Sequence, residues 1–118
     1  MKNRPFQERL KAALSGLAAA WGRERSFRTQ TVFAALAVMV LIVFESSLVW
    51  WAIMGLTIFF VLTVELLNSA FEALIDHLHP DQHPEVRIIK DMAAGAVLLA
   101  SIGALITGFL FFITALWT

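Results

Sequence analysis

The 118-residue sequence contains no cysteine, no tyrosine and only three prolines. Without cysteine the chain can form neither disulfide bonds nor thiolate metal sites, so cysteine usage says nothing about the cellular compartment. The sequence also lacks a GxxxxGK[ST] loop and the glycine-rich loop of protein kinases with its partner motifs. Both familiar scaffolds for phosphoryl transfer are therefore excluded. Charged residues make up only 15% of the chain, whereas soluble domains carry about 25%.

The apolar residues that take the place of charge point to a membrane protein. They account for 59% of the sequence, and the few charges are unevenly placed, with seven basic and two acidic side chains in residues 1–28. A basic amino-terminal segment can indicate nucleic-acid binding, but no nucleic-acid-binding motif accompanies it and a long, very apolar segment follows. We therefore expect a membrane protein that binds no nucleic acid.

The amino-terminal segment has the pattern of an amphipathic helix. Apolar residues recur at helical spacing from Phe6 to Trp21, and charged residues lie off that stripe, which predicts a helix on the membrane surface over about residues 5–22. A signal peptide is the competing interpretation, but Lys11 interrupts the apolar run and several arginines follow it. A polar hinge is expected over residues 22–28.

Three further segments are candidates for membrane spans, at about residues 28–45, 48–76 and 84–117. Each contains a long uncharged run. The run at residues 29–44 is slightly short for a hydrocarbon core that needs about 20 residues, unless Arg28 snorkels to the interface. A turn at 45–47 separates the first two, and Pro80 ends the second. Trp50 and Trp51 are expected at the membrane interface. The prediction is an all-α membrane protein, with residues 1–118 forming a single domain.

The basic residues also predict an orientation. All nine lysines and arginines lie in the amino-terminal segment or in residues 77–91, and none lies at 45–47 or after Lys90. The positive-inside rule then places the amino terminus in the cytoplasm and the carboxyl terminus outside. We expect a multi-pass protein of the inner (plasma) membrane.

The second span carries the candidate active site. Glu65, Asn68, Glu72 and Asp76 are spaced three, four and four residues apart, so they share one face of a helix. Carboxylates inside lipid are costly and usually face a protein interior, a cavity or an ion. This row of side chains is therefore the active-site hypothesis.

Other charged residues are expected at the same cytoplasmic boundary. Glu24 precedes the first span, and Lys90 and Asp91 begin the third. Carboxylates alone would also fit a cation channel or a proton relay. Carboxylates together with a lysine and an amide suit a magnesium nucleotide better, because oxygen ligands hold Mg²⁺ while a cation meets the remaining phosphate charge. Three histidines at 77, 79 and 83 have spacings that match structural zinc sites poorly, and we interpret them as loop residues.

The third span predicts self-association. Ala96, Ala100, Ala104 and Gly108 are each four residues apart, and such a stripe of small residues lets helices approach closely in lipid. Because three spans alone shield a row of carboxylates poorly, we expect a homo-oligomer.

The pattern E-x-x-N-x-A-x-E-x-x-x-D over residues 65–76, followed by Lys90-Asp91, resembles the prokaryotic diacylglycerol kinase family of small integral-membrane lipid kinases. Trp21, Glu24 and residues 26–28 are similar to the family's segment before its first span. The resemblance covers nearly the whole chain. It implies a homotrimer with active sites near the cytoplasmic face, between neighbouring protomers, where the γ-phosphate of MgATP passes to a lipid hydroxyl.

The resemblance also implies roles for individual residues. Glu65 would be the general base, and Glu24 and Glu72 would be the metal carboxylates, with Glu72 part of the nucleotide site. The remaining nucleotide-binding residues would be Asn68, Lys90, Asp91 and Arg9.

The acceptor lipid has two candidates. Residues 93–96 read Ala-Ala-Gly-Ala, where the diacylglycerol branch more often shows Gly-Ser-Ala-Ala. Together with His83-Pro84, this segment is similar to the undecaprenol kinase branch. We expect phosphorylation of diacylglycerol to phosphatidic acid, with undecaprenol as the alternative acceptor and a non-enzymatic cation channel as the alternative class.

Overall fold

The computed structural model describes residues 3–117, and every regular element within them is helical. The elements are α1 (Phe6–Arg23), α2 (Arg25–Val43), α3 (Leu48–Leu78) and α4 (Pro84–Trp117). Helices α2, α3 and α4 are long and apolar enough to cross a membrane. The prediction of an all-α chain with three candidate spans is therefore confirmed.

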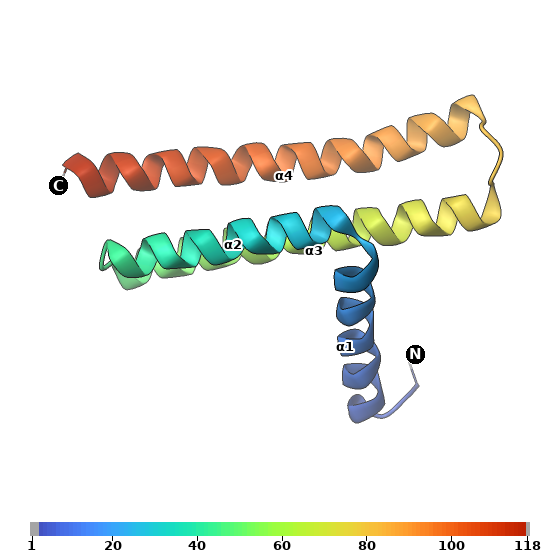
Figure 1. Ribbon diagram of the computed structural model, residues 1–118, viewed down its shortest axis with the longest axis horizontal. Helices are drawn as coiled ribbons and strands as arrows, with labels where there is room; N and C mark the ends of the chain where they lie inside the picture. Colours follow the sequence, from blue (N-terminus) through green and yellow to red (C-terminus); the bar gives the residue numbers. More distant parts are fainter. Residues whose placement is uncertain (1–2, 118) are drawn as a thin grey trace.

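Helix α3 is the central element of the bundle because it packs against both α2 and α4. The two longest helices, α3 and α4, run side by side and are joined by a short loop at one end, while α1 projects away from the bundle (Figure 1). The three spans meet in a core of Leu41, Met54 and Phe111, one from each helix. This core lies at the end of the bundle away from the α3–α4 loop.

Aromatic contacts reinforce the core. The Trp50 ring meets Phe111 edge to face, with centroids 5.2 Å apart, and Phe44 makes similar contacts with Phe111 and Phe112 at 5.8 and 5.6 Å. Edge-to-face pairs are favoured because the positive edge of one ring meets the negative face of the other. Trp50 and Trp51, expected at the membrane interface, pack against this core together with Ala37, Val40 and Ala115.

The turn between α2 and α3 is tight because backbone hydrogen bonds close the end of α2. The Ser46 amide donates to the Leu41 carbonyl and the Glu45 amide to the Ile42 carbonyl, each at 3.1 Å, which is the Schellman pattern. Glu45 adopts the left-handed conformation that this pattern requires, with φ of 48°. The Ser47 hydroxyl then accepts from the Trp50 amide at 3.4 Å and starts α3.

The loop between α3 and α4 is bounded by Pro80 and by a histidine cap. His83 Nδ1 accepts a hydrogen bond from the Glu85 amide at 3.1 Å, and the His83 carbonyl accepts from the Arg87 amide at 3.0 Å. Pro84 occupies the first helical position of α4, where its missing N–H costs nothing. His83 therefore has a structural role as the cap of α4.

The polar hinge expected over residues 22–28 is wrong in extent, since only Glu24 lies outside a helix there. Glu24 has extended backbone angles of φ −110° and ψ 107°, and α2 begins directly after it, three residues earlier than expected. Arg28 Nη1 donates to the Trp21 carbonyl at 2.7 Å, which ties the first turn of α2 to the end of α1. No proline lies nearby to keep the chain out of a helix.

Candidate active site

The buried face of α3 changes from apolar to polar along its length. Its buried residues are Met54, Val61, Glu65 and Ser69, and their spacings of seven, four and four place them on one side of the helix. Glu65 is 3% exposed and Ser69 is 6% exposed, and they are the buried polar side chains of residues 3–117. The helix thus carries a carboxylate and a hydroxyl inside the bundle, beyond its apolar core.

Asn68 Oδ1 and the Glu65 carboxylate have no hydrogen-bond partner among residues 3–117. Asn68 Oδ1 is buried and accepts no hydrogen bond from any described residue. Across residues 3–117 the Glu65 carboxylate likewise forms no hydrogen bond or ion pair. Buried polar atoms in proteins are nearly always hydrogen-bonded, so the unpaired Asn68 Oδ1 is available to a group from outside the described residues.

An ion pair joins α3 to α4 at the end of the carboxylate row. Lys90 Nζ donates to Asp76 Oδ1. The Lys90 side chain is 32% exposed and that of Asp76 is 63% exposed, so the pair lies at the rim of the bundle. Lys90 is thereby brought to the same end of α3 as Glu72, which is half-buried one turn before Asp76.

The remaining candidate residues are positioned less tightly. Glu24 is half-buried at the junction of α1 and α2, whereas Asp91 on α4 and Arg9 on α1 are exposed. In the described part of the chain, no hydrogen bond or ion pair links the side chains of these three residues to the row on α3. One chain therefore places Glu65, Asn68 and Glu72 along α3 and joins Lys90 to the Asp76 end of that row. The other three candidate residues have no such contact with the row among residues 3–117.

Oxygen donors are present around the row, but the described residues do not form an assembled metal site. Among residues 3–117 no three His, Cys, Asp or Glu side chains gather as a metal site. Mg²⁺ is commonly held by one or two carboxylates, with phosphates and water completing its coordination. The half-buried Glu72 and Glu24, and the free carbonyl oxygen of Asn68, are oxygen donors of the required kind.

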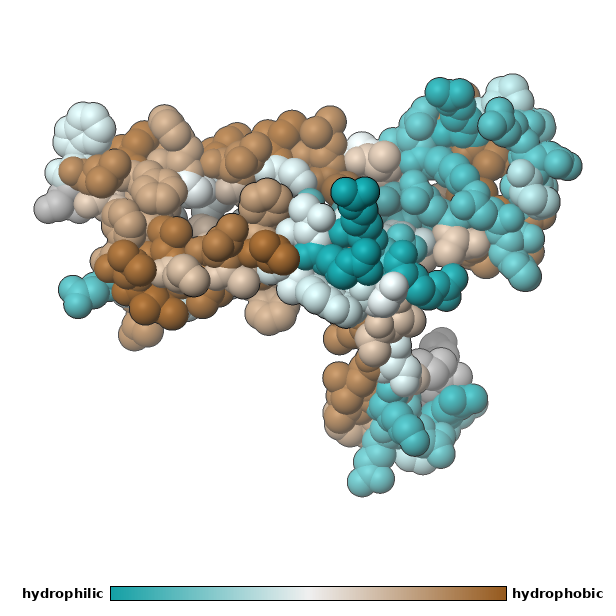
Figure 2. Space-filling view, viewed as in Figure 1, coloured by the Kyte–Doolittle hydropathy of each residue, from teal (hydrophilic) through white to brown (hydrophobic). Residues whose placement is uncertain are grey.

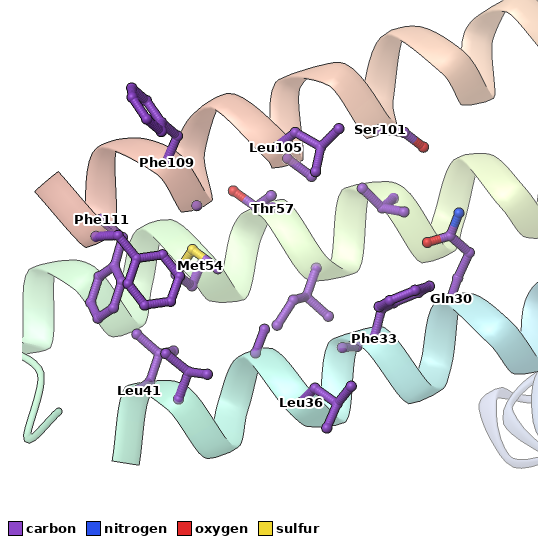
Figure 3. A pocket seen from close by; sticks show the side chains of 18 residues that line it. Gln30, Phe33, Leu36, Leu41, Met54, Thr57, Ser101, Leu105, Phe109 and Phe111 are labelled. Carbon is purple, nitrogen blue, oxygen red and sulfur yellow. The ribbon is translucent and has the colours of Figure 1, made fainter. Parts of the chain in front are cut away.

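A groove of about 600 Å³ runs between the three spans (Figure 3). Its lining is apolar except for Gln30, Thr57 and Ser101, one from each of the three helices. On α3 the lining extends to Val61, and the next residue on the same face, four positions on, is Glu65. The groove therefore follows the face of α3 that carries the carboxylate.

Polar and apolar surfaces are separated along the bundle. Figure 2 shows hydrophilic residues over the α3–α4 loop end and around the start of α2, and hydrophobic residues over the opposite end. The row on α3 lies between these two zones, because α3 runs from the hydrophobic end to the loop. Glu65 lies near the middle of α3, and Asp76 lies two residues before its loop end.

Two features of the site escaped sequence analysis. Ser69 is buried beside the row, and its only signal in the sequence is its spacing of four from Glu65. The ion pair of Lys90 with Asp76 is the second feature, and the expectation that Lys90 contacts phosphate stays a prediction. These two side chains are fourteen residues apart. Their contact depends on how α3 and α4 pack, which the residue spacing within one helix does not predict.

Comparison with known proteins finds related sequences over most of the chain. The profile of a family described as prokaryotic diacylglycerol kinase matches residues 11–112. The diacylglycerol kinase of Escherichia coli (strain K12) is 37% identical over 92 residues, which cover 78% of this chain and 75% of the relative. The undecaprenol kinase of Bacillus subtilis (strain 168) is 36% identical over 99 residues, which cover 81% of this chain and 80% of the relative.

A diacylglycerol kinase of Synechocystis is 35% identical over 97 residues, with 81% of this chain and 55% of the relative covered. The family match begins within α1, includes α2, α3 and the row on α3, and ends within α4. The chain belongs to the prokaryotic diacylglycerol kinase family and is a lipid kinase.

Proposed function

We propose that this lipid kinase transfers the γ-phosphate of MgATP to the hydroxyl of diacylglycerol and produces phosphatidic acid. The observation that carries the proposal is Glu65, a carboxylate that is 3% exposed and unpaired in the described chain. It lies on one helix face with Asn68 and Glu72, beyond an apolar groove. The diacylglycerol kinase named among the relatives supports the choice of acceptor.

In this proposal Glu65 acts as the general base. Its carboxylate takes the proton of the acceptor hydroxyl while the hydroxyl oxygen bonds to the γ-phosphorus, and the bond from that phosphorus to the bridging oxygen breaks to release ADP. The unpaired state of Glu65 suits the role, because no hydrogen bond to another residue of 3–117 has to break before the carboxylate meets the hydroxyl. Burial keeps bulk water away and so disfavours hydrolysis.

The nucleotide is proposed to lie along the cytoplasmic half of the row. Glu72 and Glu24 would hold Mg²⁺, and Lys90 would donate to a phosphate oxygen. Asn68, Asp91 and Arg9 would contact the nucleotide or orient the substrate. When bound, the metal neutralises phosphate charge and fixes the phosphates in line for attack. The protein then contributes chiefly position and charge, which suits a site with a lysine and several oxygen donors.

We further propose that the site is completed in a homotrimer. Glu24 and Arg9 make no ion pair with the α3 row in one chain, so a neighbouring protomer is the natural source of these residues at each site. A second groove of about 640 Å³ lies along the small residues of α4, at Ala96, Ala100 and Gly103. Small residues of this kind allow close helix packing in lipid.

The proposed orientation places the amino terminus and the α3–α4 loop in the cytoplasm, where ATP is found. Both segments carry the basic residues of the chain, as the positive-inside rule requires. Helix α1 would lie on the membrane surface. Its large apolar side chains are exposed, namely Phe6, Leu10, Leu14, Leu17 and Trp21, and this face would enter the headgroup region.

Undecaprenol is the second candidate acceptor, because an undecaprenol kinase is 36% identical to this chain. The groove does not discriminate between an acyl chain and a prenyl chain, since both are apolar. The cation channel considered from the sequence is set aside, because the family match identifies a kinase.

The test is a phosphorylation assay with purified protein in mixed micelles. Diacylglycerol and undecaprenol are supplied in parallel at equal mole fraction, with Mg²⁺ and ATP labelled at the γ-phosphate. We expect label in both incubations and a higher rate with diacylglycerol. A higher rate with undecaprenol would reassign the acceptor, and the absence of labelled lipid in both would refute the proposal.

A further inference from the structure

We propose that Asp76 is a positioning residue that holds the ammonium of Lys90 at the place where the phosphates of the nucleotide bind. The inference rests on the proposed function, because it concerns how Lys90 meets its ligand. Its basis is the ion pair between Asp76 at the end of α3 and Lys90 near the start of α4.

The geometry of α3 sets where the ammonium lies. Asp76 follows Glu72 by four residues on the same helix face, which corresponds to about 6 Å along the axis. By holding Lys90, Asp76 therefore fixes a positive charge about one turn beyond a proposed metal carboxylate. A metal ion held at Glu72 and the Lys90 ammonium would then both be within reach of one triphosphate chain.

The exposure of the pair argues against a mainly structural purpose. Lys90 is 32% exposed and Asp76 is 63% exposed, and ion pairs as open to solvent as this one contribute little to folding stability. Lysine is a long, flexible side chain, and a fixed partner restricts the conformations that the ammonium samples. The main effect of the ion pair is therefore to fix the position of the Lys90 ammonium.

The chemistry of the ammonium allows it to keep this partner after the ligand binds. An ammonium has three N–H donors and no acceptor. In the described chain, Asp76 is the ion-pair partner of Lys90 and accepts through one oxygen. The remaining donors of Lys90 are available to phosphate oxygens while Asp76 holds it in place.

Asp76 can in principle either strengthen or weaken nucleotide binding, so its removal would change the Kd in opposite directions in the two cases. A carboxylate near the phosphates repels them and competes for Lys90, so its removal would strengthen nucleotide binding. If Asp76 positions Lys90, its removal weakens binding even though a negative charge has been lost. The sign of the change in Kd therefore decides between the two.

The experiment measures the Kd of MgATP by equilibrium dialysis in detergent micelles, without a lipid acceptor. Asp76→Asn removes the charge at nearly constant size, and Asp76→Glu keeps it. Asp81→Asn is the matched control, because Asp81 lies exposed in the adjacent loop and has no ion pair among the described residues. It reports the effect of losing one negative charge at this end of the molecule.

We expect Asp76→Asn to raise the Kd about fivefold, as the loss of a partly exposed pair allows, while Asp76→Glu restores most of the affinity. Asp81→Asn should leave the Kd unchanged or lower it slightly. An unchanged or lowered Kd in Asp76→Asn overturns the inference and leaves the proposed function intact. A wild-type protein that binds no MgATP refutes the proposed function itself.

A charge-exchanged variant excludes a purely structural role. Asp76→Lys combined with Lys90→Asp restores an ion pair between α3 and α4 but puts the carboxylate on α4. We expect this double variant to keep wild-type thermal stability and to bind MgATP as poorly as Lys90→Asp alone. Recovery of affinity on exchange would show that the pair only joins the two helices, and the inference would be wrong.

Discussion

Replacement of Glu65 by glutamine is the sharpest test of the proposed chemistry. The two side chains have nearly the same size, and Glu65 is 3% exposed, so the substitution leaves packing on the buried face of α3 unchanged. Glu65 has no hydrogen bond or ion pair within residues 3–117, so none is lost. The fold and its thermal stability should therefore match wild type.

The expected effect on catalysis is large. A positioned general base contributes about 10²–10⁴-fold to a rate, which corresponds to about 3–5 kcal/mol in the activation free energy. Because the amide of glutamine does not accept the hydroxyl proton, kcat should fall by that factor. The KM for ATP should change little, since Glu65 is not proposed to contact the nucleotide.

The assay is transfer of labelled phosphate from ATP to diacylglycerol in mixed micelles, under initial-rate conditions. Ser69→Ala is the matched control, because Ser69 lies four residues away, is 6% exposed and is equally free of a charge partner. We expect this control to retain a rate within a few-fold of wild type. A Glu65→Gln enzyme with a wild-type kcat would refute the base assignment, and equal losses in both variants would indicate general damage to the buried face.

Three further predictions concern the scaffold. Glu45→Gly should raise the stability in detergent by about 1 kcal/mol, because Glu45 has a φ of 48° that glycine adopts freely; a lower unfolding midpoint would contradict this. Arg28→Ala removes the bond to the Trp21 carbonyl and should speed trypsin cleavage at the α1–α2 junction, whereas unchanged cleavage would show that the bond does not hold the junction. Gly103→Leu should reduce the oligomer detected by chemical crosslinking. A Cβ added at Gly103 meets nothing within 4 Å among residues 3–117, so the larger side chain would disturb a neighbouring protomer and not the chain itself. Gly16→Leu on α1 is the control and should leave crosslinking unchanged; undiminished crosslinking in Gly103→Leu would place the contact elsewhere.

The sequence pattern predicted the helices well, because each span is a long apolar segment and the segments between the spans are short and polar. The third span was expected at residues 84–117, where α4 is found, since Pro84 and the chain of apolar residues mark it clearly. The α1–α2 junction was predicted less well. Polar residues suggested a hinge of several residues, but polarity alone does not break a helix, and only Glu24 leaves helical geometry.

The candidate site was predictable as far as it lies on one helix. The spacing of Glu65, Asn68 and Glu72 is enough to place them on one face, and the burial of Glu65 agrees with it. The pairing of Asp76 with Lys90 and the packing of Trp50 on Phe111 depend instead on contacts between helices. Such contacts follow from how α2, α3 and α4 assemble, which the pattern of one segment does not encode. The roles of these residues in catalysis stay predictions.

The central claim is that Glu72 holds the metal nucleotide while Glu65 serves the acceptor hydroxyl. It is tested most directly by electron paramagnetic resonance titration of Mn²⁺, which takes the same oxygen ligands as Mg²⁺, in the presence of ATP. We predict that wild type and Glu65→Gln bind Mn²⁺–ATP with the same Kd and that Glu72→Gln binds it much more weakly. Equal binding by Glu72→Gln, or loss of binding in Glu65→Gln, would contradict this division of roles.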